Sequence, residues 1–398
     1  MNVAIVGGGP AGLRAAEVAA EAEASVTLYD AKPSVGRKFL VAGRGGLNLT
    51  NTEPFAAFRE RYGTPRELWR SLLTSFDADA LREWANSLGI ETFCATTGRV
   101  YPREMKAAPL LRRWLQRLRR RGVTFAAKHR LIGIHSDKQV IVQFDGPEGS
   151  VTKHVDAAVL ALGGGSWPQT GSDGTWVETL SNVGIAVMKL EPANCGWECD
   201  WSPEVLQIAE GKPLKNIVAR ALTCEVGGEL LVTRYGLEGG AIYQLGPALR
   251  AMPEPVITID FKPSFTVAQL VDKLGPARRN LLGEARTRWR LSDAAFAVVK
   301  ASATSRKLDS GTSVAELVKH CDIRLSRPRP LAEAISSAGG ISWSELDDSL
   351  MLRRLPGVFA AGEMIDWEAP TGGYLIQGAF ATGTRAGDAA VEWARSNS

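Results

Sequence analysis

A glycine-rich turn at the start of the chain constrains the fold more than any other feature. Residues 3–6 form a short apolar run typical of a buried parallel strand, and Gly7, Gly9 and Gly12 then follow a G-x-G-x-x-G pattern. The alanine-rich stretch after the turn predicts a helix. A second strand-like run, SVTLYD, ends at Asp30, eighteen residues after Gly12. This order predicts a Rossmann-type unit that binds a dinucleotide.

Each residue of the turn has a physical role in that interpretation. Gly7 permits the tight turn, Gly9 lets a pyrophosphate approach bare backbone, and Gly12 lets the helix pack on its strand. Asp30 can accept the ribose hydroxyls as charge-assisted hydrogen bonds and would repel a 2′-phosphate. NAD and FAD both satisfy these requirements, so the motif alone does not choose between them.

A second glycine turn near the C-terminus favours FAD. A strand expected at 358–361 is followed by Gly362 and Glu363, and the sequence TGGY at 371–374 then opens a helix that continues to the end of the chain. A flavin needs one helix N-terminus for its pyrophosphate and another for the pyrimidine edge, which becomes negative on reduction. The free N–H groups at 373–376 and the helix dipole would stabilise that charge and raise the reduction potential.

Composition limits the alternatives. A length of 398 residues predicts two or three domains, and 45% hydrophobic with 23% charged residues argues against disorder. No apolar run is long enough for a transmembrane helix, and the N-terminus enters a strand at once, so neither membrane nor signal peptide is expected. Five scattered cysteines are typical of a reduced, cytoplasmic protein. Cys195 and Cys199 have no nearby Cys or His partner, and no metal is expected.

The middle of the chain holds a polar loop and a second strand end. Residues 32–51 are expected to form a long loop whose cations Arg37, Lys38 and Arg44 could wrap a phosphate. A buried strand expected at 157–162 runs into glycines but not into an alanine-rich helix. Because a second complete dinucleotide unit is missing, NAD(P)H would have to dock transiently as an electron donor.

The order of strand-like and helix-like segments along the chain predicts an α/β fold with insertions. Residues 1–189 and 336–398 are expected to form a discontinuous Rossmann-type FAD-binding domain. Short strands and frequent turns predict an inserted β-rich domain at 190–262, to which the chain returns near 319–335. Residues 263–318 have a helical pattern and are expected to form a further inserted domain.

A basic helix is expected at 106–121. Its leucines and Trp114 form an apolar stripe and arginines fill the rest. A solvated crossover helix is favoured over an RNA-contacting surface, because the net charge is only +4 and no aromatic residues interrupt the basic face.

Four stretches together resemble a known family. GRKFLVAGRGGLNLTN, GRVYPREMKA, ALGGGSWPQTGSDG and GVFAAGEMID with TGGY are similar to hallmarks of the three-domain bacterial flavoproteins called HI0933-like or aminoacetone-oxidase-like. The resemblance implies noncovalently bound FAD and no separate NADPH domain. It also implies that the backbone of Leu131 or Ile132 contacts the adenine. The cofactor-binding residues expected from the resemblance and their neighbours are Gly7, Gly9, Pro10, Ala11, Gly12, Asp30, Ala31, Lys32, Arg37, Lys38, Leu131, Ile132, Ala161, Gly163, Gly362, Glu363, Gly373, Tyr374, Leu375 and Ile376.

The chain departs from the family pattern at positions expected to line the flavin. Many members have an Arg-Cys pair where this chain has Gly46 and Leu47, and they commonly read Asn-Leu-Gln-Trp-Ala where this chain has residues 375–379. A thiol that could protonate a substrate carbon is therefore absent, and no activity is carried over from better-studied members.

Three functions remain open from the sequence. The first is an oxidoreductase that moves hydride between a small organic substrate and flavin N5, reoxidised by O2 or reduced by NAD(P)H, with Arg44, Asn48, Tyr101 and Trp167 as candidate catalytic residues. The second is a flavin-dependent reductase of uridine in RNA. The third is a flavin-holding protein that binds a partner without catalysis.

Overall fold

The computed structural model describes residues 1–43, 45–276, 279–303 and 307–397. The chain forms two compact units, one from Met1–Glu191 together with the segment from Ser336 to the C-terminus, and the other from Pro192–Ile335. Within the described residues, no helix has both the length and the apolar character needed to cross a membrane.

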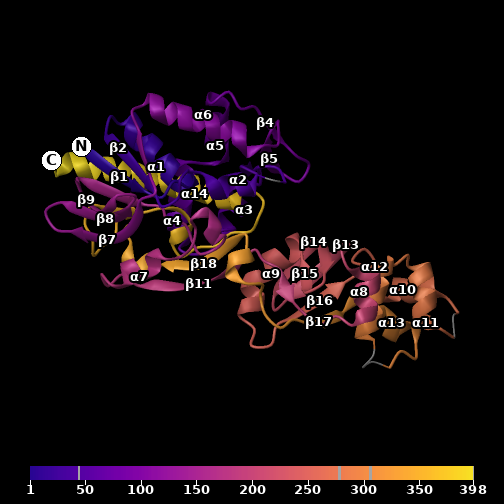
Figure 1. Ribbon diagram of the computed structural model, residues 1–398. Helices are drawn as coiled ribbons and strands as arrows, with labels where there is room; N and C mark the ends of the chain where they lie inside the picture. Colours follow the sequence, from indigo (N-terminus) through magenta and orange to yellow (C-terminus); the bar gives the residue numbers. More distant parts are fainter. Residues whose placement is uncertain (44, 277–278, 304–306, 398) are drawn as a thin grey trace. The chain divides into compact units, whose positions relative to one another are not determined.

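The first unit is built on a five-stranded parallel sheet (Figure 1). Its strands, in spatial order, are β19 (Val358–Ala360), β10 (Ala157–Leu160), β1 (Asn2–Val6), β2 (Ser25–Asp30) and β6 (Thr124–Ala127). β10 and β19 are buried along their whole length, as expected for apolar runs covered on both faces. The expected α/β class with a parallel Rossmann-type sheet is confirmed.

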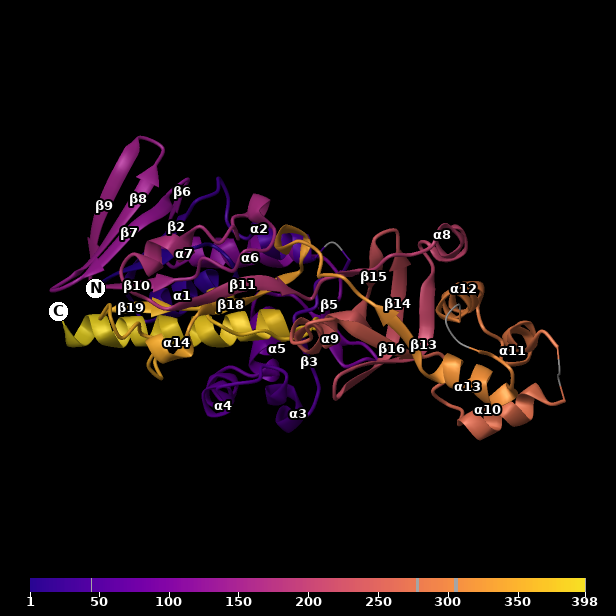
Figure 2. The ribbon, with the colours of Figure 1, turned by 90° about the horizontal axis from the view of Figure 1, so that it is seen from below.

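Two long helices cross closely beside this sheet. α1 (Pro10–Glu21) and α14 (Tyr374–Ser396) lie side by side, as Figures 1 and 2 show. Gly383 and Gly387 permit the close approach, because a Cβ on Gly383 would overlap the carbonyl oxygen of Ala11 and one on Gly387 would lie 2.9 Å from that of Ala15. Residues at the two ends of the sequence are thereby fixed against each other.

Smaller elements complete the first unit. Antiparallel strands form two three-stranded sheets, one from β7 (Arg130–Ser136), β8 (Val140–Gly146) and β9 (Gly149–Val155), and one from β3 (Thr50–Asn51), β5 (Arg99–Pro102) and β4 (Thr92–Cys94). A further pair is formed by β11 (Val187–Ala193) and β18 (Ser336–Ile341). The other helices are α2 (Arg37–Ala42), α3 (Phe55–Glu60), α4 (Arg66–Ser75), α5 (Ala78–Ser87), α6 (Ala107–Arg120) and α7 (Trp176–Ser181), with short 3-10 turns η1 (Pro168–Thr170), η3 (Trp343–Glu345) and η4 (Gly362–Met364). The stretch 32–51 is therefore not a continuous loop, since α2 and β3 occupy part of it.

A buried carboxylate explains the arginines of α6. Glu17 of α1 is fully buried and accepts hydrogen bonds from the indole nitrogens of Trp84 (2.8 Å) and Trp114 (3.1 Å). Its other oxygen lies 3.1 Å from an Nη of Arg117 and 3.5 Å from one of Arg121. These two arginines of the basic segment therefore compensate a buried charge, which supports the interpretation of α6 as a structural crossover helix.

The second unit combines one antiparallel sheet with helices (Figure 2). Its strands, in spatial order, are β12 (Trp197–Glu198), β15 (Gly236–Glu238), β14 (Cys224–Thr233), β13 (Pro213–Ala221), β16 (Val256–Asp260) and β17 (Cys321–Arg324). Its helices are α8 (Pro203–Ala209), α9 (Gly240–Arg250), α10 (Val267–Leu274), α11 (Leu281–Arg288), α12 (Asp293–Ser302) and α13 (Gly311–Lys319), with the 3-10 turn η2 (Leu331–Glu333). One continuous hydrophobic core joins strand residues such as Ile257 to helix residues such as Val298 and Val314. The division of this unit into a β-rich and a helical domain stays a prediction.

Candidate cofactor site

The first glycine turn is packed on one side and open on the other. A Cβ on Gly7 would overlap the carbonyl oxygen of Ala161, and a Cβ on Gly12 would overlap that of Gly7. Gly9 differs, because nothing lies within 4 Å of where its Cβ would be. Gly7 and Gly12 are thus required by the fold, whereas the absence of a side chain at Gly9 leaves space for a ligand.

The N-terminus of α1 points its first N–H groups toward that space without a protein cap. Gly9 is the N-cap, no side chain accepts from the first turn, and the first turn contains no acidic residue. The first backbone bond within the helix is from the N–H of Leu13 to the carbonyl of Gly9, at 2.9 Å. The N–H groups of Ala11 and Gly12 precede it and form an anion-binding position suited to a pyrophosphate.

Asp30 lies at the end of β2, where the ribose was expected. Its carboxylate accepts the backbone N–H of Gly8 at 2.8 Å and that of Lys32 at 2.7 Å. Burial raises the pKa of Asp30 above its usual value of 3.8, and the two N–H donors oppose the rise. These bonds hold the carboxylate beside the glycine turn, and its remaining lone pairs can accept ribose hydroxyls.

Lys38 and Glu363, both expected to contact FAD, form an ion pair with each other. Lys38 Nζ lies 2.6 Å from Glu363 Oε2 and donates to Ser166 Oγ at 2.6 Å. The other oxygen of Glu363 accepts the backbone N–H of Ser337 at 2.8 Å, and Ser337 Oγ accepts the N–H of Gly165. Ser166 and Ser337 were missed from the sequence. The GGGS run marks Ser166 as a loop residue only, and no local pattern points to Ser337.

The second glycine turn is also packed against its surroundings. Gly373 is the N-cap of α14 with φ 101°, and a Cβ there would overlap the backbone of Thr50. The first helical bond runs from the N–H of Gln377 to the carbonyl of Gly373, at 3.0 Å. The N–H groups of Tyr374, Leu375 and Ile376 therefore have no acceptor within the helix, and no side chain caps it.

Several positions expected to line the flavin face the protein core instead. Leu47 and Gln377 are fully buried, and the amide of Gln377 accepts from Thr50 Oγ1 at 2.8 Å and donates to the carbonyl of Phe76 at 2.7 Å. Gly378 is packed against Trp367. The expectation that these three residues line the flavin is wrong, because neighbouring side chains already fill the space around them. Leu375 and Ile376 are partly exposed at the start of α14.

The side chain of Tyr374 is bound by other side chains of the protein. Its hydroxyl donates to Glu53 Oε2 at 2.7 Å, and Arg61 Nε donates to the same oxygen at 3.0 Å. The hydrogen bond from Arg61 lowers the pKa of Glu53, and burial raises the pKa of Tyr374. The ring is buried against Phe58. Any contact of Tyr374 with a cofactor would therefore use its backbone N–H.

Among the buried side-chain polar atoms that lack partners in the described residues, two lie in the segment expected to wrap the cofactor. They are Nε of Arg37 and Oδ1 of Asn48. A buried donor or acceptor left unpaired costs about 1–3 kcal/mol. A bound phosphate would satisfy a guanidinium donor, and a bound flavin carries N–H groups. The two glycine turns, Asp30, Arg37 and Asn48 together form what we call the cradle. Its chemistry fits a flavin dinucleotide.

The candidate catalytic residues are only partly brought together. Tyr101 lies beside the loop that holds Asn48, since a Cβ on Gly46 would be 3.6 Å from the Tyr101 ring. Trp167 has φ 60° and its carbonyl accepts Thr170 Oγ1 at 2.7 Å, which fixes the turn into η1. Arg44 lies outside the described residues.

The expected adenine contacts lie on β7, which has a register shift. Leu131 pairs with Phe144 and Gly133 with Gln143, so Ile132 has no partner in the β8 register. Leu131 is buried and Ile132 is exposed. The backbone of Ile132 is therefore left outside the ladder, as a backbone contact to a ligand would require.

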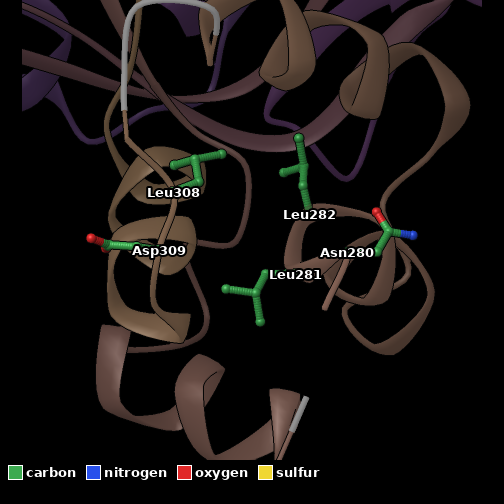
Figure 3. A pocket seen from close by; sticks show the side chains of 5 residues that line it. All are labelled: Asn280, Leu281, Leu282, Leu308 and Asp309. Atoms are coloured by element: carbon green, nitrogen blue, oxygen red, sulfur yellow. The ribbon is translucent and has the colours of Figure 1, made fainter. Parts of the chain in front are cut away.

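A pocket in the second unit is lined by groups that do not suit a dinucleotide. It has a volume of about 310 Å³ and is lined by Asn280, Leu281, Leu282, Leu308 and Asp309 (Figure 3). Three leucines and one carboxylate provide no set of groups that would hold a dinucleotide. In the part of the chain that the structure describes, no three His, Cys, Asp or Glu side chains gather as metal ligands.

Comparison with known proteins identifies the class. The family model described as HI0933-like protein Rossmann domain matches residues 1–389, and the chain therefore belongs to that family. The resemblance noted in the sequence is confirmed.

Two relatives match over nearly their whole length. One is a 3-dehydro-bile acid delta(4,6)-reductase of Clostridium scindens, 27% identical over 98% of this chain and 99% of the relative. The other is a ribosomal RNA dihydrouridine synthase of Escherichia coli, 22% identical over 95% of each chain.

Solved structures share the fold. A 3-ketosteroid-Δ4-(5α)-dehydrogenase of Rhodococcus jostii has a TM-score of 0.55 at 15% identity, covering 98% of this chain and 96% of its own. A flavocytochrome c3 fumarate reductase has a TM-score of 0.53 at 17% identity, covering 99% of this chain and 78% of its own. Together with the family assignment, the cradle identifies the protein as an FAD-dependent oxidoreductase.

Proposed function

We propose that the protein is a reductase that adds hydrogen across a carbon–carbon double bond next to a carbonyl group in a small organic substrate. NAD(P)H would supply the electrons by docking transiently, and FAD would be held noncovalently. When bound, FAD takes up a hydride at N5 and passes it to a carbon acceptor. The names of the two relatives support this reaction class, because one refers to a delta(4,6)-reductase and the other to the formation of dihydrouridine.

The N-terminus of α14 is the observation that carries the proposal. Its free N–H groups at Tyr374, Leu375 and Ile376, set by the packed Gly373, suit negative charge at the pyrimidine edge of the flavin. A helix N-terminus stabilises such charge by about 0.3–2 kcal/mol. This stabilisation favours a cofactor that is readily reduced by a nicotinamide.

The residues of the loop would orient the substrate and supply the proton. Reduction of a double bond needs a proton at the carbon next to the one that receives hydride. Tyr101 carries a hydroxyl that no described residue binds, and it lies beside the loop of Asn48. We assign Tyr101 as the proton donor and Asn48 as a group that orients the substrate carbonyl or the flavin edge.

The test separates the two halves of the reaction. The purified, FAD-loaded protein is titrated anaerobically with NADH and then NADPH, and bleaching of the flavin absorbance is followed. An α,β-unsaturated ketone is then added, and recovery of the yellow colour with a saturated product is expected. Tyr101→Phe should slow only the second half.

Other outcomes would redirect the assignment. A protein that nicotinamides leave yellow, and that consumes O2 with an amine, would be an oxidase and would contradict the reductase proposal. Reduction of RNA is less supported, because Arg117 and Arg121 of α6 are engaged by Glu17 and Arg113 donates to the carbonyl of Leu88 at 3.0 Å. Turnover of any substrate would exclude a purely flavin-holding role.

A further inference from the structure

We propose that Trp367, Trp69 and Trp343 form a one-electron relay that connects the flavin cradle to the protein surface. The ring centroids of Trp367 and Trp69 are 5.1 Å apart, and those of Trp69 and Trp343 are 5.9 Å apart. Indole is among the most easily oxidised side chains, and rings in contact exchange single electrons rapidly. The relay goes beyond hydride transfer, which involves electron pairs.

The inner end of the relay is attached to the cradle. Trp367 is buried, and its indole N–H donates to the carbonyl of Gly362 at 2.8 Å. Gly362 belongs to the expected cofactor contacts at the end of β19. Gly378 of α14 leaves the necessary space, because a Cβ there would lie 2.8 Å from Cη2 of Trp367.

The middle member can pass charge but cannot release a proton. Trp69 is fully buried, and its Nε1 has no hydrogen-bond partner among the described residues. An oxidised Trp69 would therefore keep its proton and remain a cation. The ring of Tyr62 stacks on it with a centroid distance of 4.3 Å and an interplanar angle of 25°, so that an electron-rich face stabilises positive charge there.

The outer end can complete the reaction. Trp343 is partly exposed in η3, and its indole N–H donates to the carbonyl of Asp366 at 2.6 Å. Loss of one electron from Trp343 leaves a radical cation at the surface, and when the hydrogen bond to the carbonyl of Asp366 opens, the Nε1 proton passes to water and a neutral radical remains. The electron passes through Trp69 and Trp367 to a one-electron oxidant in the cradle, and a small thiol in solution restores Trp343 by returning one electron and one proton. When oxygen radicals oxidise a group in the cradle by one electron, such a path would move that oxidation to Trp343 at the surface.

Light provides the oxidant for the test. The inference rests on FAD binding at the cradle, so the FAD content of each sample is measured first, and only fully loaded protein is used. A laser pulse on the oxidised holoprotein is followed by transient absorption. The wild type should give a long-lived tryptophan radical. Trp343→Phe should shorten the lifetime of the separated charges by at least an order of magnitude, and Trp69→Phe should abolish radical formation at the surface.

A tryptophan outside the relay provides the control. Trp393 lies near the far end of α14 and is partly buried, and Trp393→Phe should leave the radical signal unchanged. Equal signals in the wild type, Trp343→Phe and Trp69→Phe would overturn the relay. A signal lost only in Trp393→Phe would also overturn it. Trp343→Phe keeps the ring packing, so a folded, FAD-loaded variant is expected and the comparison does not depend on activity.

Discussion

Lys38 Nζ lies 2.6 Å from Glu363 Oε2 and joins two residues 325 positions apart in the sequence. Both side chains are largely buried, with exposed fractions of 24% and 18%. Ser166 and Ser337 bind the same pair, so α2, the turn after β10, β18 and η4 meet at one point. The two residues expected to contact FAD separately are thus one electrostatic unit that also shapes the cradle.

Because the two charges compensate each other, we predict that their removal is not additive. Lys38→Met and Glu363→Gln should each weaken FAD binding and lower the free energy of unfolding, and the double variant should lose less than the sum, with a coupling of about 1 kcal/mol. Fluorescence titration with FAD and urea unfolding measure the two effects. Lys189→Met is the matched control, since Lys189 is 86% exposed and 3.8 Å from Glu191. Simple additivity would show that Lys38 and Glu363 act independently.

Substitutions at two glycines of the first turn should affect the stability of the apoprotein and its affinity for FAD separately. Gly12→Ala should destabilise the apoprotein strongly, because its Cβ would overlap the carbonyl of Gly7. Gly9→Ala should leave the melting temperature of the apoprotein nearly unchanged, since nothing lies within 4 Å of that Cβ, and should abolish FAD binding. Calorimetry without FAD and equilibrium dialysis with FAD measure the two properties. If Gly9→Ala bound FAD normally, the pyrophosphate could not lie against this turn.

The first turn could be predicted from sequence because its constraints are local. The spacing of Gly7, Gly9 and Gly12 directly reflects backbone contacts within one strand–helix unit. The ion pair of Lys38 and Glu363 could not be predicted, because it depends on how four distant segments meet. Both residues were predicted as separate contacts of FAD, which stays a prediction, and the ion pair between them was not predicted.

Two other features were ambiguous in sequence for a similar reason. The family resemblance implies that Tyr374 contacts FAD, yet the hydroxyl of Tyr374 donates to Glu53 and its ring is buried. The arginines of α6 have the pattern of a solvated face, and a single glutamate on α1, Glu17, engages two of them. In both cases the deciding partner comes from another part of the chain.

Glu17 should be among the most costly single sites for stability. Glu17→Gln removes the carboxylate that compensates Arg14 and Arg117, whose side chains are 11% and 20% exposed, while Arg121 keeps its ion pair with Glu21. Removal of one partner from a buried ion pair costs about 3–5 kcal/mol, which should appear as a lower urea midpoint. Glu67→Gln is the control, because Glu67 is 75% exposed and pairs only with Arg70 among the described residues. Equal midpoints for the two variants would mean that the Glu17 cluster contributes no net stability.

The pH dependence of FAD binding should depend on Asp30. Burial raises the pKa of Asp30 above 3.8, so its carboxylate becomes protonated at a higher pH than an exposed aspartate. Protonation removes the charge that strengthens the bonds to the ribose, and FAD affinity should therefore fall as the pH falls through the raised pKa.

At neutral pH, Asp30→Asn should weaken binding by about 10- to 100-fold, the equivalent of one charge-assisted hydrogen bond. The difference between wild type and variant should shrink toward zero at low pH, because both side chains are then neutral. Dissociation constants of FAD, measured for both proteins from neutral to acidic pH, test this prediction. Asp145→Asn is the control, because Asp145 is exposed. A ratio of affinities that stays constant with pH would show that the ionised carboxylate of Asp30 does not hold the cofactor.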